Sequence, residues 1–412
     1  MTPYLSAHFP GTGGHIKQTP EDFEVEELPL YRPCGEGEHL YLFVEKRGLT
    51  TLDLLRHLAR AFGLRERDLG YAGLKDARAL TRQWISLPGV RREQLGELDL
   101  PGVRILEADY HRNKLRLGHL AGNQFRIRIR GANTNTLETT RDVLHVLAQV
   151  GVPNIFGSQR YGVLNNSHLI GRALVAGDFN EAARQILGDP AAIQDPRWRQ
   201  AAQSFRDGDL RAAQAALPRH MADERRLVNS LMSDKDVRRA VLAFPRRKLR
   251  LYLSACQSWL FDRLVAMRLS SLDVLWPGDL AYIHGKGACF QVDDPNIEQP
   301  RADKFEISPS GPLFGTKVRL ATAQAGLLEE SLLAEAGLNL ESFRLPAGLT
   351  MEGERRPLRV PLHQPAAHPL DADLEVTFSL PRGSYATSVI REIIKDGGCV
   401  AEEPGPGGAQ NG

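Results

Sequence analysis

Cysteine is scarce in this sequence, and the motifs that usually hold metals or nucleotide phosphates are missing. The four cysteines, Cys34, Cys256, Cys289 and Cys399, lie far apart, with no C-x-x-C pair and no histidine at zinc spacing. This pattern predicts a reduced compartment and no structural metal. There is also no P-loop, no G-x-G-x-x-G entering a helix and no G-x-S-x-G. We therefore expect any chemistry to run on a lone carboxylate, without metal or cofactor.

Long apolar runs and a large net charge are also absent. No run reaches the roughly 18 apolar residues of a membrane span, and the first residues lack a basic region followed by an apolar core. We expect a cytoplasmic protein that does not enter a membrane. The formal net charge is only +2, so a nucleic-acid surface would have to come from local clusters of cations. With 412 residues, 42% of them hydrophobic, the chain is long enough for two domains or more.

One carboxylate stands out in the segment of residues 70–83. Asp76 follows a Gly-x-x-Gly turn and has Lys75, Arg78 and Arg82 close by in the sequence. Neighbouring cations favour the ionised form of a carboxylate, and the same cations would attract a polyanion such as RNA. The alternative is that Asp76 is an ordinary turn residue or helix cap.

A second segment is basic. Residues 111–120 are rich in cations and lead into a strictly alternating run, 124–130, which predicts a strand with Phe125 on its apolar side and arginines on the other. Such stripes bind phosphates, although a solvated strand face is the alternative for each arginine singly. Asn123 lies beside a glycine, and its amide can read a base edge or simply occupy a turn.

Two further segments mix amide, guanidinium and aromatic side chains between glycines. The first covers residues 152–162 and includes Arg160, and the second covers 380–388 and includes Tyr385. Side chains of these kinds stack on unpaired bases and grip phosphates. The alternative for both segments is an ordinary Gly/Pro loop.

Periodicity predicts a chain of α+β class in several parts. Helical spacing occurs over residues 50–63, with Thr50 or Thr51 as N-cap, over 137–147 and over 246–269, and strand alternation returns at 374–380. Residues 165–245 are rich in Ala, Arg, Asp and Gln. The late strand has no obvious partner in the middle region, so one economical topology returns it to the N-terminal sheet and makes the middle an insertion. The tail from 401 to 412 has nothing to bury, which predicts disorder.

Taken together, these segments resemble the TruD family of tRNA pseudouridine synthases. The matching segments, in chain order, are residues 16–25, 35–40, 72–76, 114–119 with 122–125, 153–162 and 380–392. Any one of them would be weak evidence, but six in this order are highly specific. Residues 175–245 match the family pattern least well.

The resemblance implies an enzyme that isomerises a uridine of tRNA, at position 13 of the D-arm, to pseudouridine. An aspartate is the nucleophile in that family, and Asp76 is the matching residue. The implied fold is a pseudouridine-synthase-type catalytic domain with a mixed, largely antiparallel sheet, interrupted by a large family-specific inserted domain. We expect the catalytic domain at 1–162 and 351–400, and the inserted domain at 163–350, or about 151–360 in its widest extent. We expect a monomer with tRNA as its partner.

The uridine must be extruded from the tRNA, and the extruded base needs side chains that stack on it and bind its edge. Phe23 and Tyr385 are expected to sandwich the base, and Asn123 to read the uracil edge. Lys17 is expected to contact Asp76 or a phosphate. Phe125 and Arg160 complete the set.

Two other functions remain open. A non-catalytic tRNA-binding protein or RNA-folding chaperone would use the same cleft, although an intact Asp76 motif argues against lost activity. A phosphatase with an aspartate nucleophile would require a D-x-D pattern and magnesium-binding carboxylates, which the sequence lacks.

Overall fold

The computed structural model describes residues 3–98, 100–132, 136–233 and 236–395 of the 412-residue chain. By its internal contacts the chain divides into two compact units. We call Tyr4–Val152 with the residues from Val360 onward the sheet unit, and Pro153–Arg359 the helical unit. The chain passes from one to the other at two short strands, β7 (Val152–Pro153) and β12 (Arg359–Val360).

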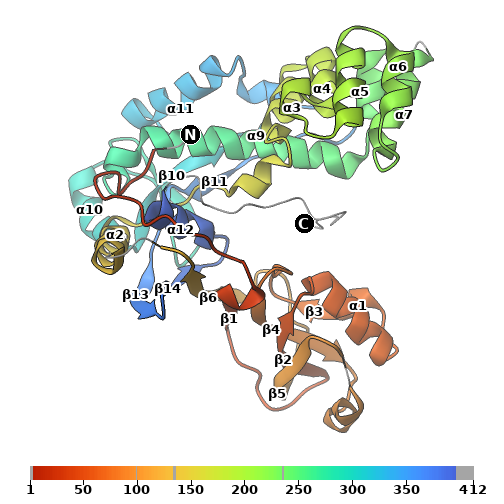
Figure 1. Cartoon of the computed structure of the whole chain (residues 1–412). Helices are drawn as coiled ribbons and strands as arrows, with labels where there is room; N and C mark the ends of the chain where they lie inside the picture. The colour runs from red at the N-terminus through yellow and green to blue at the C-terminus, as the bar shows by residue number, and fades with distance from the viewer. Residues whose placement is uncertain (1–2, 99, 133–135, 234–235, 396–412) are drawn as a thin grey trace. The chain divides into compact units, whose positions relative to one another are not determined.

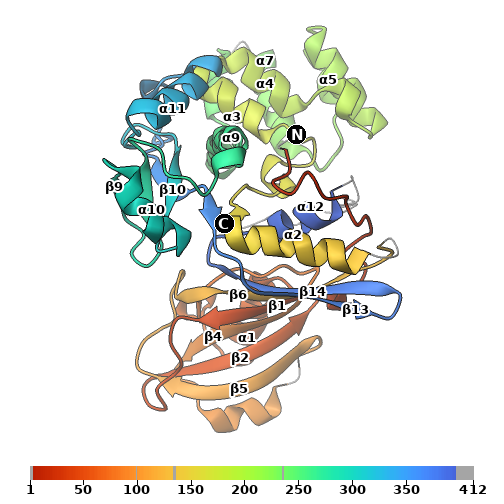
Figure 2. The same ribbon diagram turned by 90° about the vertical axis from the view of Figure 1, so that its left-hand side faces the viewer.

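The sheet unit is built on one mixed, mostly antiparallel sheet of eight strands. Its strands are β1 (Phe23–Pro29), β2 (His39–Arg47), β3 (Gly70–Tyr71), β4 (Leu80–Pro88), β5 (Val103–His111), β6 (Leu120–Ile129), β13 (His363–Leu370) and β14 (Asp373–Pro381). Their order across the sheet is β13-β14-β6-β1-β4-β2-β5 (Figure 2). β3 pairs with β4. Only the β1–β4 pair among these is parallel.

β14, the strand nearest the C-terminus, lies between β13 and β6 in this sheet. β14 pairs antiparallel with β6 over eight residues, from Leu374 opposite Ile129 to Pro381 opposite Gly122. The expectation that the strand at 374–380 returns to the N-terminal sheet is therefore confirmed. The α+β class with a mixed, largely antiparallel sheet is confirmed as well.

Three helices complete the sheet unit, namely α1 (Thr51–Ala61), α2 (Thr136–Val150) and α12 (Ala386–Ile394). Thr50 caps α1, because its side chain accepts a hydrogen bond from the backbone N–H of Asp53. α2 and α12 cover one face of the sheet around β6 and β14 (Figure 2). Their apolar side chains share one buried cluster with those strands, which fixes the helices on the sheet.

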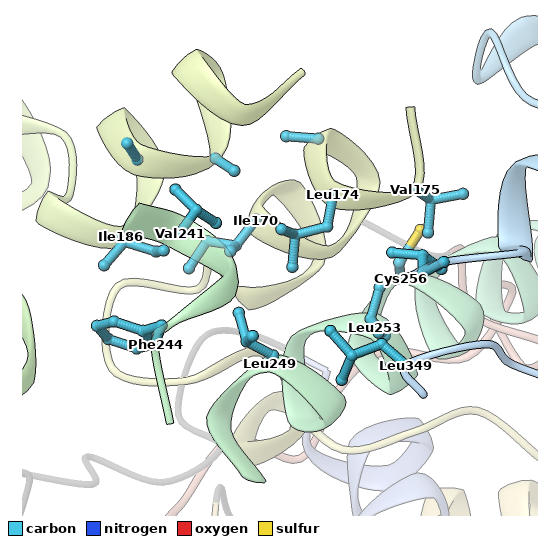
Figure 3. Packing of buried hydrophobic residues seen from close by; sticks show 14 of the residues in the cluster. Ile170, Leu174, Val175, Ile186, Val241, Phe244, Leu249, Leu253, Cys256 and Leu349 are labelled. Carbon is cyan, nitrogen blue, oxygen red and sulfur yellow. The ribbon is translucent and has the colours of Figure 1, made fainter. Parts of the chain in front are cut away.

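The helical unit surrounds one long buried helix, α9 (Arg246–Met267). The other helices are α3 (Ser167–Ala176), α4 (Phe179–Leu187), α5 (Pro196–Arg206), α6 (Leu210–Ala216), α7 (Ala222–Met232), α8 (Val237–Leu242), α10 (Pro295–Asp303) and α11 (Ala323–Glu335). Figure 3 shows the apolar side chains of α3, α4, α8 and α9 meeting in one core (see also Figure 1). Gly171 allows α3 to pack closely against α9, because a Cβ at this position would lie 2.0 Å from the carbonyl oxygen of Tyr252 on α9.

A small second sheet belongs to the helical unit. Its strands are β8 (Leu280–Ile283), β9 (Cys289–Gln291), β10 (Ile307–Leu313) and β11 (Glu354–Pro357), in the order β11-β10-β8-β9. None of the helices that the structure describes is both long enough and apolar enough to span a bilayer. The predicted tail at 401–412 lies outside the described residues.

We propose that the middle of the chain is a separable domain, and limited proteolysis tests this. Cleavage inside residues 165–345 should leave fragments 1–160 and 360–400 associated, because the β14–β6 ladder joins them. Native size exclusion of the nicked protein should show one species, and the same digest in denaturant should show separate fragments. Fragments that dissociate under native conditions would contradict this domain arrangement.

Candidate active site

The predicted site residues that lie on strands, among them Phe23 and Phe125, share one face of the central strands. Residues that are directly opposite in a ladder lie on the same face, as do alternate residues of one strand. Val25 of β1 is opposite Phe125 of β6 and Thr81 of β4, and Thr81 is opposite Lys46 of β2. Phe23 lies two residues from Val25 and therefore on this face too.

Asp76 lies in the loop of residues 72–79 that joins β3 to β4. Its Oδ2 accepts a hydrogen bond from Lys17 Nζ at 2.8 Å, and its Oδ1 accepts one from the backbone N–H of Arg78 at 3.0 Å. The Asp76 side chain is 39% exposed, whereas the Lys17 side chain is 9% exposed. The carboxylate is thus oriented by two donors and still reachable from solvent.

The environment keeps the Asp76 carboxylate ionised. Burial alone would raise the pKa of Asp76, but the charge and hydrogen bond of Lys17, the Arg78 N–H and the charge of Lys46 together lower this pKa below its usual value. The carboxylate is therefore charged at neutral pH. Lys17 and Lys46, whose charges lower this pKa, come from other parts of the chain, whereas the neighbouring Arg78 contributes its backbone N–H.

Lys17 adopts a strained backbone conformation. Its φ is +61°, in the left-handed region that non-glycine residues rarely occupy, at a cost of about 1 kcal/mol or more. The preceding segment holds it there, since His15 exchanges both backbone hydrogen bonds with Arg130. From this position Lys17 Nζ lies 4.6 Å from the centre of the Phe23 ring while it binds Asp76. Lys17, Phe23 and Asp76 thus form one contact group.

Buried polar contacts fix the Asp76 loop from below. Lys75 Nζ binds Glu27 Oε2 at 2.8 Å, and both side chains are almost fully buried. The backbone N–H of Lys75 donates to Thr51 Oγ1 at 2.8 Å, and Thr51 donates to Gln83 Oε1 at 2.9 Å. Lys46 Nζ donates to the carbonyl oxygens of the loop. The loop therefore has few ways to move without breaking a buried hydrogen bond.

Asn123 presents an unused polar atom beside this network. It is directly opposite Glu27 in the β1–β6 ladder, on the same face. Its Oδ1 is buried and, within the part of the chain that the structure describes, accepts no hydrogen bond. An unsatisfied buried acceptor costs about 1–3 kcal/mol, so a ligand N–H at this place would be stabilised.

The three aromatic residues of the predicted set differ in exposure. Phe23 and Phe125 are each only 6% exposed and pack edge to face, with ring centres 6.2 Å apart. Phe125 also packs on Phe378 of β14. Tyr385, the residue before α12, is 40% exposed. Of the three side chains, that of Tyr385 is the most exposed.

Comparison with known proteins decides the family. A family profile described as tRNA pseudouridine synthase D (TruD) matches residues 1–393 of the chain. The chain belongs to the TruD family. Members of this family are enzymes that isomerise uridine in tRNA, and the resemblance seen in the sequence is confirmed.

Individual relatives cover nearly the whole chain. A tRNA pseudouridine synthase D from Syntrophotalea carbinolica is 58% identical over 395 residues, which are 96% of this chain and 99% of that relative. One from Geobacter metallireducens is 55% identical over 396 residues, 96% of this chain and 98% of that relative. A crystal structure of a Methanosarcina mazei chain described as TruD superposes with a TM-score of 0.84 at 28% identity and covers 96% of each chain.

Arg160 of the segment 153–162 belongs to the helical unit, whereas the other predicted site residues belong to the sheet unit. Its guanidinium donates to Ser258 Oγ at 3.0 Å and to Ser254 Oγ, one turn apart on α9. The next residue, Tyr161, donates to Asp262 on the following turn. These hydrogen bonds attach the segment to α9, which gives its polar side chains a structural role. A contact of Arg160 with substrate stays a prediction.

The basic stripe predicted along β6 is largely neutralised. Arg128 binds Asp373 at 2.6 Å and Arg130 binds Asp22 at 2.7 Å. Arg126 is 60% exposed, and its guanidinium is 3.9 Å from Glu375. The carboxylates come from segments distant in sequence, so the local pattern of arginines overstated the positive charge of this face.

Sequence reasoning missed four residues of the network below the loop: Glu27, Lys46, Thr51 and Gln83. One of them left a signal. Residues 40, 42 and 44 of β2 are apolar and buried, and Lys46 continues the same alternation. A lysine at a core position of a strand indicates a buried ammonium with a specific role.

Proposed function

We propose that this protein isomerises uridine 13 in the D-arm of tRNA to pseudouridine, with Asp76 as the nucleophile and without metal or cofactor. The observation that carries the proposal is the Asp76 carboxylate, which is ionised, oriented by Lys17 and accessible. Membership of the TruD family supplies the reaction class. The position in the tRNA rests on the family resemblance alone.

The reaction needs little besides a fixed carboxylate. The N1–C1′ bond of the uridine breaks, the uracil rotates and C5 bonds to C1′. The proton on C5 is lost to a base and N1 takes up a proton, so the product is an isomer of the substrate. Three routes are open to Asp76: attack at C1′, addition to the base, or assistance of elimination to a glycal. Charge develops on the sugar and the base in each route, and Lys17 lies where it can balance that charge beside Asp76.

Recognition of the extruded uridine is assigned to Tyr385 and Asn123. The aromatic and 40% exposed side chain of Tyr385 is suited to stack on the base. The unpartnered Oδ1 of Asn123 is suited to accept the uracil N3–H. Phe23, with Phe125 packed against its edge, supports the site from the core by its contact with Lys17.

Substitution of Tyr385 should separate stacking from folding. Tyr385→Ala should slow single-turnover chemistry on folded tRNA about tenfold or more, because base stacking is worth about 1–3 kcal/mol and 1.4 kcal/mol is a factor of ten. Its melting temperature should stay unchanged, since Tyr385 makes no side-chain capping bond and is 40% exposed. Tyr385→Phe should be nearly silent. Phe125→Ala is the contrasting variant, with a loss of about 3–5 kcal/mol in unfolding free energy. A folded Tyr385→Ala protein with the normal rate would remove this residue from the site.

The function itself is tested by mapping pseudouridine. Unmodified tRNA carrying uridine 13 is treated with the protein, with and without a chelator, and analysed by carbodiimide primer extension. We expect one new stop, corresponding to position 13, in both conditions. A stop at another nucleotide would contradict the proposed position. Loss of the stop in the presence of chelator would contradict a metal-free reaction. Tight tRNA binding without any stop would favour the chaperone alternative.

A further inference from the structure

Lys46 is a fully buried lysine directly beneath the proposed nucleophile. It lies near the end of β2, and its relative exposure is 0%. Its ammonium donates to the carbonyl oxygens of Asp76 at 3.1 Å, Lys75 at 3.4 Å and Leu49. Two of these three acceptors belong to the Asp76 loop, and the third precedes the cap of α1.

No carboxylate touches this ammonium among the contacts of the described residues, which makes its burial costly. The charged groups that act on it are Asp76 and Lys75 from the loop and Asp53 from α1. From the sheet it faces Thr81 of β4 and Val103 of β5, neither of which titrates. Burial lowers the pKa of Lys46 to about 8, although the charges of Asp76 and Asp53 oppose the shift.

We propose that Lys46 is a positioning residue for the isomerisation, whose buried ammonium holds the backbone of the Asp76 loop and provides a second cation for the carboxylate. This inference rests on the proposed role of Asp76. Lys17 orients the carboxylate at its tip, and Lys46 fixes the residue at its backbone. Loss of one proton from the Lys46 ammonium leaves two N–H donors for its three carbonyl acceptors and removes one of the charges that keep Asp76 ionised.

The pH dependence has a definite sign. The ammonium is required, so the rate of chemistry falls as pH rises through about 8. The unfolded chain keeps this proton up to the ordinary value of 10.5. Between these values the unfolded state binds more protons, so the contribution of Lys46 to the free energy of unfolding increases with pH. The alkaline loss of activity therefore occurs in folded protein.

The experiment is a single-turnover assay with saturating protein and tRNA labelled with tritium at uridine C5, from about pH 6.5 to pH 9.5, around the midpoint near 8. The wild-type rate should fall by up to about tenfold per pH unit above the midpoint. Lys46→Met should be slower by about tenfold or more at pH 7, without an alkaline decline, and should bind tRNA within a few-fold of wild type. Lys46→Arg, whose charge persists, should recover most of the rate at pH 7 and shift the decline upward.

Lys395→Met is the matched control, because Lys395 Nζ also donates to two backbone carbonyls, of Ser6 and Phe9, at the far end of α12. It should lower the melting temperature without changing the pH profile. A wild-type rate that is flat to pH 9.5, or a folded Lys46→Met protein with the wild-type rate and profile, would overturn the inference. If Lys46→Arg does not fold, the wild-type pH profile and the rate of Lys46→Met still test the inference. Wild-type protein that forms no pseudouridine at any pH would instead contradict the proposed function.

Discussion

Asp76→Asn is expected to abolish pseudouridine formation while the protein still binds tRNA. The amide keeps the shape of the side chain but loses the charge and nucleophilicity on which every route depends. The single-turnover rate should fall by on the order of a thousandfold or more, the scale seen when a nucleophile is removed. The tRNA dissociation constant should stay within a few-fold, since removing one negative charge does not weaken contact with a polyanion. Filter binding and tritium release measure the two effects separately.

Asp68→Asn is the control for this variant. Asp68 ends the short 3-10 helix Glu66–Asp68 of the sheet unit and is paired with Arg65 at 2.7 Å. Its substitution should change neither rate nor affinity, because an exposed ion pair contributes little. Substantial pseudouridine formation by Asp76→Asn would show that another group attacks the nucleotide.

Lys17→Met is expected to have the second-largest effect and to change the pH profile. It leaves Asp76 with its burial but without its nearest cation, so the pKa of Asp76 rises. The native profile should stay flat into mildly acidic pH, whereas that of Lys17→Met should fall as pH drops, with its acid limb displaced upward. At pH 7 the lost orientation of the carboxylate should cost about tenfold or more in single-turnover rate, or at least about 1.4 kcal/mol.

The free energy of unfolding at low pH should also depend on the pair of Lys17 and Asp76. A carboxylate whose pKa is depressed in the folded protein stabilises it above the usual carboxyl pKa, and this contribution is lost as pH falls. Lys17→Met should therefore flatten the acid side of the unfolding curve. Lys317→Met removes an exposed lysine, paired with Glu352 at 2.7 Å, and should leave both curves unchanged. An unchanged acid limb in Lys17→Met would mean that Lys17 does not control Asp76.

Local patterns in the sequence were enough to predict much of the fold. The alternation at 124–130 and 374–380 predicted β6 and β14. The spacing at 50–63 predicted α1 with Thr50 or Thr51 as its cap, and Thr50 is the cap. These signals are local because a strand or helix is read from side chains two to four residues apart. The Gly-x-x-Gly turn pointed to Asp76 for the same reason.

Contacts between distant segments could not be read in this way. The arginines of β6 appeared cationic because Asp373 and Asp22, which neutralise Arg128 and Arg130, are about 245 and 108 positions away. The burial of Phe23 could not be read from the sequence: pairing of β1 with β6 places its ring in the core against Phe125, and its contact with the base stays a prediction. Charge and exposure depend on neighbours that only the register of the strands selects.

The sequence alone determined the family, the order of its motifs and the candidate nucleophile, because each of these is a property of consecutive residues. The tertiary structure decided which groups act on Asp76. Lys17 and Lys46 are 59 and 30 residues from it. Lys46 meets the loop because β2 and β4 are neighbours in one sheet, and Lys17 is placed by the pairing of His15 with Arg130. A carboxylate acquires its pKa and orientation from the groups within a few ångströms, and folding brings those groups together from separate strands and loops.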